Sequence, residues 1–200
     1  FKDKTFTVEN CHNYNEIRNS AKADNISLPS DKLNIVTVAR FGKEKGVLRA
    51  IRAVSKLEKK DLLEYYIIGD GTEFEQAKAL IDELKLSENV TLLGEKENPY
   101  GYIKAADLLL IPSYSEAAPM VIGEAACLGV PVLSTETSSS EEMVVATGYG
   151  FVCKNSQDGI TQALEEIINN QSLIKEKSSF LNSQKFSNAN ALNQFSELVK

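Results

Sequence analysis

The chain has 200 residues, of which 42% are hydrophobic and 25% are charged, and its formal net charge is -6. An acidic chain does not suit a nucleic-acid partner, which would require a basic face. No apolar run approaches the ~20 residues that a membrane-spanning helix needs, and we expect no signal peptide. The three cysteines are widely spaced and odd in number, which predicts free thiols in a reducing compartment rather than disulfides or a zinc site.

Apolar runs rich in β-branched residues alternate along the chain with stretches in which apolar residues recur at helical spacing. The pattern predicts, in chain order, a strand at 33–39, a helix at 45–57, a strand at 64–70, a helix at 72–86, a strand at 90–94, a short helix at 99–106, a strand at 107–112 and a helix at 118–129. It continues with strands at 130–134 and 150–154, a helix at 156–170, and two helices in 173–200 that separate near 183–187.

Residues typical of helix ends support three of these helices. Thr72, followed three residues later by Glu75, predicts a capping box at the second helix. Pro119 is expected in the first turn of the fourth helix. Ser156 or Asp158 is expected to cap the fifth.

The predicted strands are apolar along their whole length, and such strands need helices on both faces. Short, regular strand–helix units therefore predict an α/β fold built on a doubly wound parallel sheet. In such a sheet the carboxyl ends of the strands lie on one edge, and ligands bind just beyond them. We place this sheet in residues 33–183, after a polar lead-in at 1–32 and before a final segment at 184–200.

The first predicted strand is followed by "ARFGKEKG", which gathers the cations Arg40, Lys43 and Lys45 at the ligand-binding edge. Gly42 and Gly46 leave the backbone free to turn there. Arginine can hold a phosphate through two donors, and lysine acts as a point charge. Taken alone, the stretch fits a solvated loop of charges equally well.

The second predicted strand is followed by "GDG", residues 69–71. Such a triplet is more often a tight turn than a ligand contact. The chain contains neither a GxGxxG dinucleotide fingerprint nor a P-loop motif, which disfavours a dehydrogenase or an NTPase.

The stretch after the strand at 107–112 holds two carboxylates, Glu116 in a loop and Glu124 about one and a half turns into a helix. Free N–H groups around Met120–Ile122 would form an anion site at the helix start. Glu124 lies among apolar residues, where an unpaired carboxylate is costly. It could form a salt bridge to Arg40 or Lys45, face solvent, or accept hydrogen bonds from ligand hydroxyls such as those of a ribose.

Four motifs occur in the order expected of one family. They are the E-x7-E pair of Glu116 and Glu124 within "PSYSEAAPMVIGEAACLGVPVLS", and "ARFGKEKG", "IIGDG" and "VTLLGE". Over residues 33–153 the sequence resembles the C-terminal, donor-binding half of retaining GT-B glycosyltransferases, known as group 1 or family 4. The resemblance implies one Rossmann-like half-domain.

The resemblance implies roles for particular residues. Arg40, Lys45 and Glu116 would be catalytic, the two cations binding the donor diphosphate and the carboxylate binding sugar hydroxyls near the reacting carbon. Glu124 would hold the ribose hydroxyls. The remaining donor-binding positions would be the backbone around Pro119, Met120, Val121 and Ile122, through its free amides, a base-binding loop at Gly94, Glu95 and Lys96, and glycines at the pocket floor, Gly69 and Gly71.

The resemblance also implies the chemistry, which is sugar transfer with retention of configuration from a nucleotide-diphosphate sugar. Fixed cations and a helix start would stabilise the leaving diphosphate, so we expect no metal and no cofactor. The chain has no DxD metal motif. It departs from the family at Ala117 and at Ala39, where glycine is usual, and these departures leave the sugar open.

Proteins of this family have a second, acceptor-binding domain before the donor domain. Residues 1–32 resemble the connector from it, with "FTVENCHNY" in place of a strand and an Asn-Pro-type turn. Residues 186–200 resemble the last helix, which crosses back to that domain. We therefore expect an isolated donor domain that binds nucleotide and transfers little sugar. We expect His12 to be a polar surface residue.

The resemblance favours a bacterial surface-polysaccharide pathway and a cytoplasmic location, with attachment to the inner membrane face left open. The sequence leaves two functional alternatives, besides a Rossmann-like fold with no ligand, which would leave the clustered charges unexplained. One is another GT-B enzyme, such as a sugar-nucleotide epimerase or a phosphorylase. The other is a non-catalytic nucleotide-binding module. The base, the sugar and the acceptor are not indicated.

Overall fold

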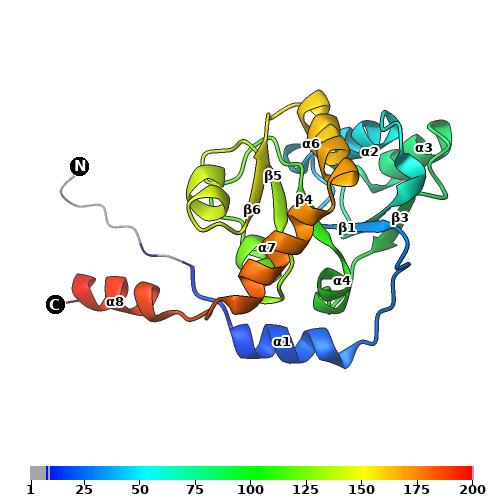
Figure 1. Ribbon diagram of the computed structural model, residues 1–200. Helices are drawn as coiled ribbons and strands as arrows, with labels where there is room; N and C mark the ends of the chain where they lie inside the picture. The colour runs from blue at the N-terminus through cyan, green and yellow to red at the C-terminus, as the bar shows by residue number, and fades with distance from the viewer. Residues whose placement is uncertain (1–7, 9, 200) are drawn as a thin grey trace.

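The structure, a computed structural model, describes residue 8 and residues 10–199, and is built on a six-stranded parallel sheet with helices on both faces (Figure 1). The strand order is β3-β2-β1-β4-β5-β6. This is the order of a Rossmann-like doubly wound sheet, so the predicted fold class is confirmed.

The strands are β1 (Leu33–Val38), β2 (Leu63–Ile68), β3 (Val90–Gly94), β4 (Leu108–Ile111), β5 (Val132–Thr135) and β6 (Gly150–Cys153). The helices are α1 (Tyr14–Ala23), α2 (Val47–Ser55), α3 (Phe74–Glu83), α4 (Tyr100–Ala105), α5 (Val121–Cys127), α6 (Gln157–Asn169), α7 (Ser172–Ser183) and α8 (Ala189–Leu198). Shorter turns are η2 (Lys43–Lys45), η3 (Lys60–Leu62) and the π-helical η4 (Glu141–Val145).

Every predicted strand and helix is present, but two predictions at helix ends are wrong. Thr72 does not cap α3: residue Glu73 precedes the helix without a side-chain cap, and the Thr72 hydroxyl donates instead to the Phe41 carbonyl at 3.3 Å. Pro119 lies ahead of α5 rather than in its first turn, because the helix begins at Val121. The Ser156 cap is confirmed, since its hydroxyl accepts from the Gly159 amide.

The sheet separates two apolar clusters, as a parallel sheet buried on both faces requires. Alternate residues of one strand enter different clusters: Ile35 packs with α2, α3 and α6, and Val36 packs with α1, α4 and α5. Both side chains are fully buried. The near-continuous apolar runs of the sequence follow from this two-sided burial.

The lead-in contains helix α1, which the sequence analysis did not predict. Ile17 and Ala21 are its buried residues, and the helix packs against α4 and α5. Its other positions are largely polar, so the apolar stripe is only two residues long. The proposed resemblance of "FTVENCHNY" to a strand lies partly outside the described residues.

The prediction that His12 is a surface residue is wrong. His12 is buried, and its ring lies against Gly123, where an added Cβ would approach Nε2 to within 2.5 Å. Its amide donates to Oδ1 of Asn188 at 3.0 Å, and the Asn188 side chain donates to the His12 carbonyl at 2.8 Å. Desolvation lowers the pKa of His12. These bonds join the lead-in to the start of α8.

Helix α8 projects from the body beside the lead-in (Figure 1). Its apolar residues Leu192 and Phe195 are exposed. The domain boundaries, and a crossing of this helix to another domain, stay predictions. In the part of the chain that the structure describes, no helix is both long and apolar enough to span a bilayer.

The order of the sheet places β1 beside β4, where the direction of winding reverses. The loops that follow these two strands meet at Gly46, which has a φ of 67°. A Cβ added to Gly46 would lie 2.1 Å from the Pro112 carbonyl oxygen, so both the backbone angle and the available space require glycine.

We predict that Gly46→Ala destabilises the protein far more than Gly94→Ala. Gly94 has a nearly identical φ of 68°, but an added Cβ meets nothing within 4 Å. Left-handed strain should cost Gly94→Ala about 1–2 kcal/mol, and the added clash should bring Gly46→Ala to at least ~3 kcal/mol. Urea unfolding measures both, and equal losses would contradict the packing of Gly46 on Pro112.

Candidate functional site

A cavity of about 300 Å³ lies at the carboxyl ends of β1 and β4. This is the reversal point of a doubly wound sheet, where ligands of such sheets bind. The residues that line it come from the two strands, their following loops and the start of α5. They are Thr37, Val38, Ala39, Arg40, Lys45, Leu109, Leu110, Ile111, Pro112, Ser113, Glu116, Pro119, Met120 and Val121.

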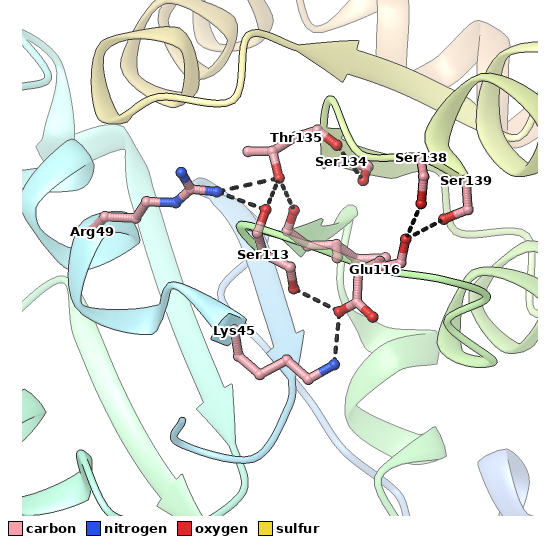
Figure 2. A network of polar contacts seen from close by, with 9 residues as sticks. Lys45, Arg49, Ser113, Glu116, Ser134, Thr135, Ser138 and Ser139 are labelled. Atoms are coloured by element: carbon pink, nitrogen blue, oxygen red, sulfur yellow. Dashed lines mark hydrogen bonds and ion pairs between the residues drawn. The ribbon is translucent and has the colours of Figure 1, made fainter. Parts of the chain in front are cut away.

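Lys45 and Glu116 form an ion pair at this cavity, with 2.7 Å between Nζ and Oε1 (Figure 2). The Ser113 hydroxyl donates to the same carboxylate oxygen at 2.6 Å. The Glu116 side chain is 11% exposed and that of Lys45 is 25% exposed. The sequence analysis predicted both residues at one site and did not predict that they pair with each other.

The backbone of Glu116 is also anchored. Its carbonyl accepts a hydrogen bond from the Ser138 hydroxyl at 2.8 Å and another from Ser139 at 3.3 Å. Figure 2 shows both serines reaching it from the loop after β5. The side chain of Glu116 is therefore bound by Lys45 and Ser113, and its main chain is bound by a different segment, the loop after β5.

Arg49 of α2 is a site-supporting residue that the sequence analysis missed. It is 5% exposed, and its guanidinium donates to the carbonyl of Pro112 at 2.8 Å. It also donates to the carbonyl of Ser113 at 2.7 Å (Figure 2). It also stacks over the Tyr114 ring at 3.7 Å. Arg49 thereby fixes the loop that carries Ser113 and Glu116. An arginine on an amphipathic helix looks like a surface charge in sequence, so no local signal identifies this role.

Arg40 lines the cavity and is exposed. No hydrogen bond or ion pair joins its side chain to the other described residues. Its guanidinium is therefore available to an anionic ligand, in contrast to the ammonium of Lys45, which Glu116 already holds.

Glu124 does not line this cavity, and it lies in the first turn of α5 rather than one and a half turns in. It is half-buried, and the Tyr100 hydroxyl donates to its Oε1 at 3.4 Å. Desolvation raises the pKa of Glu124, and the hydrogen bond from Tyr100 partly opposes this. Of the alternatives for Glu124, a salt bridge to Arg40 or Lys45 is absent among the described residues, since Lys45 pairs with Glu116.

The start of α5 offers fewer free amides than expected. The Ile122 amide donates to the Pro119 carbonyl at 3.3 Å, so it is already used within the turn. The amides of Met120 and Val121 have no partner among the described residues.

The three glycines predicted at the donor site, Gly69 and Gly71 after β2 and Gly94 at the end of β3, do not line the cavity. Gly69 and Gly71 allow the loop after β2 to pack directly on the backbone of Ala39 and Phe41. Gly94 is the last residue of β3, and its carbonyl accepts a hydrogen bond from the Gly69 amide at 2.9 Å. The next two residues, Glu95 and Lys96, are exposed. Their predicted roles stay predictions.

Within the described residues, no group of three His, Cys, Asp or Glu side chains is arranged to hold a metal ion. The cysteines are free: Cys11 is exposed, Cys127 is buried, and Cys153 is half-buried. Burial raises the pKa of the Cys127 and Cys153 thiols to about 11.

The fold is that of one half-domain of the GT-B glycosyltransferase class. The family model "Glycosyl transferases group 1" matches residues 19–184, and the chain belongs to this family. The match begins within α1, which the sequence analysis had treated as part of a lead-in.

Relatives include the lipopolysaccharide core biosynthesis glycosyltransferase LpsD of Rhizobium meliloti (strain 1021), 36% identical over 115 residues, 58% of this chain and 32% of that protein. The putative colanic acid biosynthesis glycosyltransferase WcaL of Escherichia coli (strain K12) is 32% identical over 151 residues, 70% of this chain and 37% of that protein. The chain thus spans about a third of the length of these curated relatives.

The fold is similar to that of Anabaena Alr3699/HepE, whose crystal structure was solved in complex with UDP and glucose. The TM-score is 0.72 at 20% identity, over 93% of this chain and 51% of that one. At this level of identity the likeness concerns the fold.

We predict that Glu124→Gln stabilises the ligand-free protein at pH 7, by about 2 °C or more in Tm. The folded-state pKa of Glu124 is raised above the ordinary 4.5, so stability falls as pH rises through that pKa. Glutamine cannot ionise, so the variant does not lose this stability as the pH rises. The advantage should shrink as pH falls toward 4.5.

Thermal melts between pH 4.5 and pH 7 measure this difference. Glu142→Gln is the matched control, because Glu142 is exposed on η4 and its substitution should leave Tm unchanged. A Tm gain for Glu124→Gln that is constant across this range would contradict the assigned cause.

Proposed function

We propose that this chain is the donor-binding half of a glycosyltransferase that moves a sugar from a nucleotide-diphosphate sugar to an acceptor. The observation that carries the proposal is the convergence of Arg40, Lys45 and Glu116 on one cavity at the reversal point of the sheet. The two cations and the carboxylate come from two loops that are far apart in sequence, and a solvated loop of charges would not require their convergence.

In this proposal Arg40 and Lys45 bind the diphosphate. Arginine offers paired donors to phosphate oxygens, and its side chain is exposed here with no partner among the described residues. The segment that leads into α5 borders the same cavity with Pro119, Met120 and Val121. The complex of HepE with UDP and glucose supports a ligand of this class on this fold.

Glu116 would accept hydrogen bonds from the donor sugar, and Glu124 from the ribose. Glu124 follows the cavity-lining Val121 by three residues, so the two share one face of α5. Tyr100, which contacts Glu124, begins the helix after β3. This arrangement supports a nucleotide that runs from the cavity past Glu124 toward the loop at 94–96.

The reaction breaks the glycosyl–phosphate bond and leaves negative charge on the diphosphate. Fixed cations beside that charge stabilise the transition state, provided they are held in place before the reaction. We assign retention of configuration, metal independence and the absence of a cofactor to this enzyme on the family resemblance. Transfer would require an acceptor-binding domain that is N-terminal to this one, in keeping with the third of each relative that the chain matches.

The names of the relatives refer to lipopolysaccharide core and colanic acid biosynthesis. On this ground we propose a role in bacterial surface-polysaccharide synthesis. The resemblance further favours a cytoplasmic location and leaves attachment to the inner membrane face open.

Calorimetric titration with UDP, GDP and ADP tests the proposal. One nucleotide should bind, and Arg40→Ala should weaken its binding about tenfold or more, since a charge-assisted hydrogen bond is lost. Glu124→Ala should weaken it as well, by removing the ribose acceptor. Lys43→Ala is the matched control: Lys43 is an exposed cation of the same loop that does not line the cavity.

Binding of the nucleotide should be unaffected by Lys43→Ala. Failure of all three nucleotides to bind would overturn the proposal. Equal losses in the Arg40 and Lys43 variants would show that the loop acts through general charge and not through the assigned contact.

A further inference from the structure

The ion pair at the cavity holds its two members in fixed positions. Oε1 of Glu116 lies 2.7 Å from Lys45 Nζ and 2.6 Å from the Ser113 hydroxyl. The carbonyl of Glu116 is bound by two further serines. Because Arg49 grips the Pro112 and Ser113 carbonyls, the loop beneath the carboxylate is held as well. The carboxylate therefore has little freedom to turn away when a ligand enters.

A diphosphate that enters the cavity competes with Glu116 for Lys45. If the ligand takes the ammonium, Glu116 loses its sole ion-pair partner among the described residues. A carboxylate that is 11% exposed then stands beside an anionic ligand. Like charges in a partly buried site repel, and the carboxylate then keeps only the Ser113 hydroxyl as a donor, which does not neutralise its charge.

A sugar attached to the diphosphate changes this balance. A carboxylate is acceptor-only and can take hydrogen bonds from two hydroxyls at once. Sugar hydroxyls next to Glu116 would donate to the carboxylate in place of the Lys45 ammonium, which has moved to the diphosphate. The ligand with a sugar replaces the donor that Glu116 loses, and the ligand without a sugar leaves that donor missing.

We infer that the Lys45–Glu116 pair is a selectivity device that favours a nucleotide-diphosphate sugar over the sugar-free nucleotide diphosphate. This inference rests on the proposed function and extends it. The device weakens retention of the nucleotide once its sugar has been transferred, which favours release of the product. Glu116 thus sets which state of the ligand is held, in addition to contacting the sugar.

Arg40 supplies the internal comparison. It lines the same cavity and has no partner among the described residues, so no internal ion pair must be broken when it binds phosphate. Its contribution should be the same for the ligand with the sugar and for the ligand without it. Arg40→Ala should lower the affinities for the two ligands by the same factor, whereas Glu116→Gln should change the ratio of the two affinities.

The experiment titrates the 200-residue chain and its variants with UDP, GDP and ADP, and with the glucose conjugate of the one that binds best. Glutamine at 116 keeps the shape and an oxygen for Ser113 but removes the charge. Glu116→Gln should tighten binding of the free nucleotide diphosphate about three- to tenfold and weaken binding of the conjugate. Ser113→Ala, which frees the carboxylate to turn, should lower the selectivity in the same direction by a smaller factor.

The outcomes separate the two proposals. If the wild-type chain binds none of the nucleotides, the proposed function and this inference both fail. If it binds, and Glu116→Gln leaves the free nucleotide unchanged or weakens both ligands equally, the inference fails alone. Circular dichroism of each variant confirms that it is folded. The free-nucleotide measurement does not depend on which sugar the enzyme uses.

Discussion

The site depends on a single close approach between two loops of the sheet. Gly46, after β1, lies so near the Pro112 carbonyl oxygen that no side chain fits between them. Arg49 then binds the Pro112 and Ser113 carbonyls from the same side. Two strands that are neighbours in space and distant in sequence are thereby joined at their carboxyl ends. The cavity lies at these same ends, and Pro112 and Ser113 are part of its lining.

The fold could be predicted because it follows from local patterns. Strands such as β1 and β4 are apolar throughout, which requires cover on both faces, and helical stretches separate them at regular spacing. Placing Arg40, Lys45 and Glu116 at one edge followed from the rule that parallel strands end together. The prediction therefore needed no knowledge of individual contacts.

The parts that sequence reasoning missed depend on contacts between distant segments. α1 buries only Ile17 and Ala21, too few positions to reveal a helical period. His12 is buried because Gly123, more than 100 residues away in the chain, has no side chain in its path. The pairing of Lys45 with Glu116 depends on loop positions within a few ångströms. Residue types and spacing carry no such information.

His12 and Asn188 join the segment ahead of α1 to the segment ahead of α8, although 176 positions separate them in the chain. The amide and the carbonyl of His12 each form a hydrogen bond with the Asn188 side chain. The His12 ring lies against Gly123 of α5, and Val121 of the same helix lines the cavity. A side chain at position 123 would collide with the ring, so this glycine lets both segments pack beside the helix that borders the cavity.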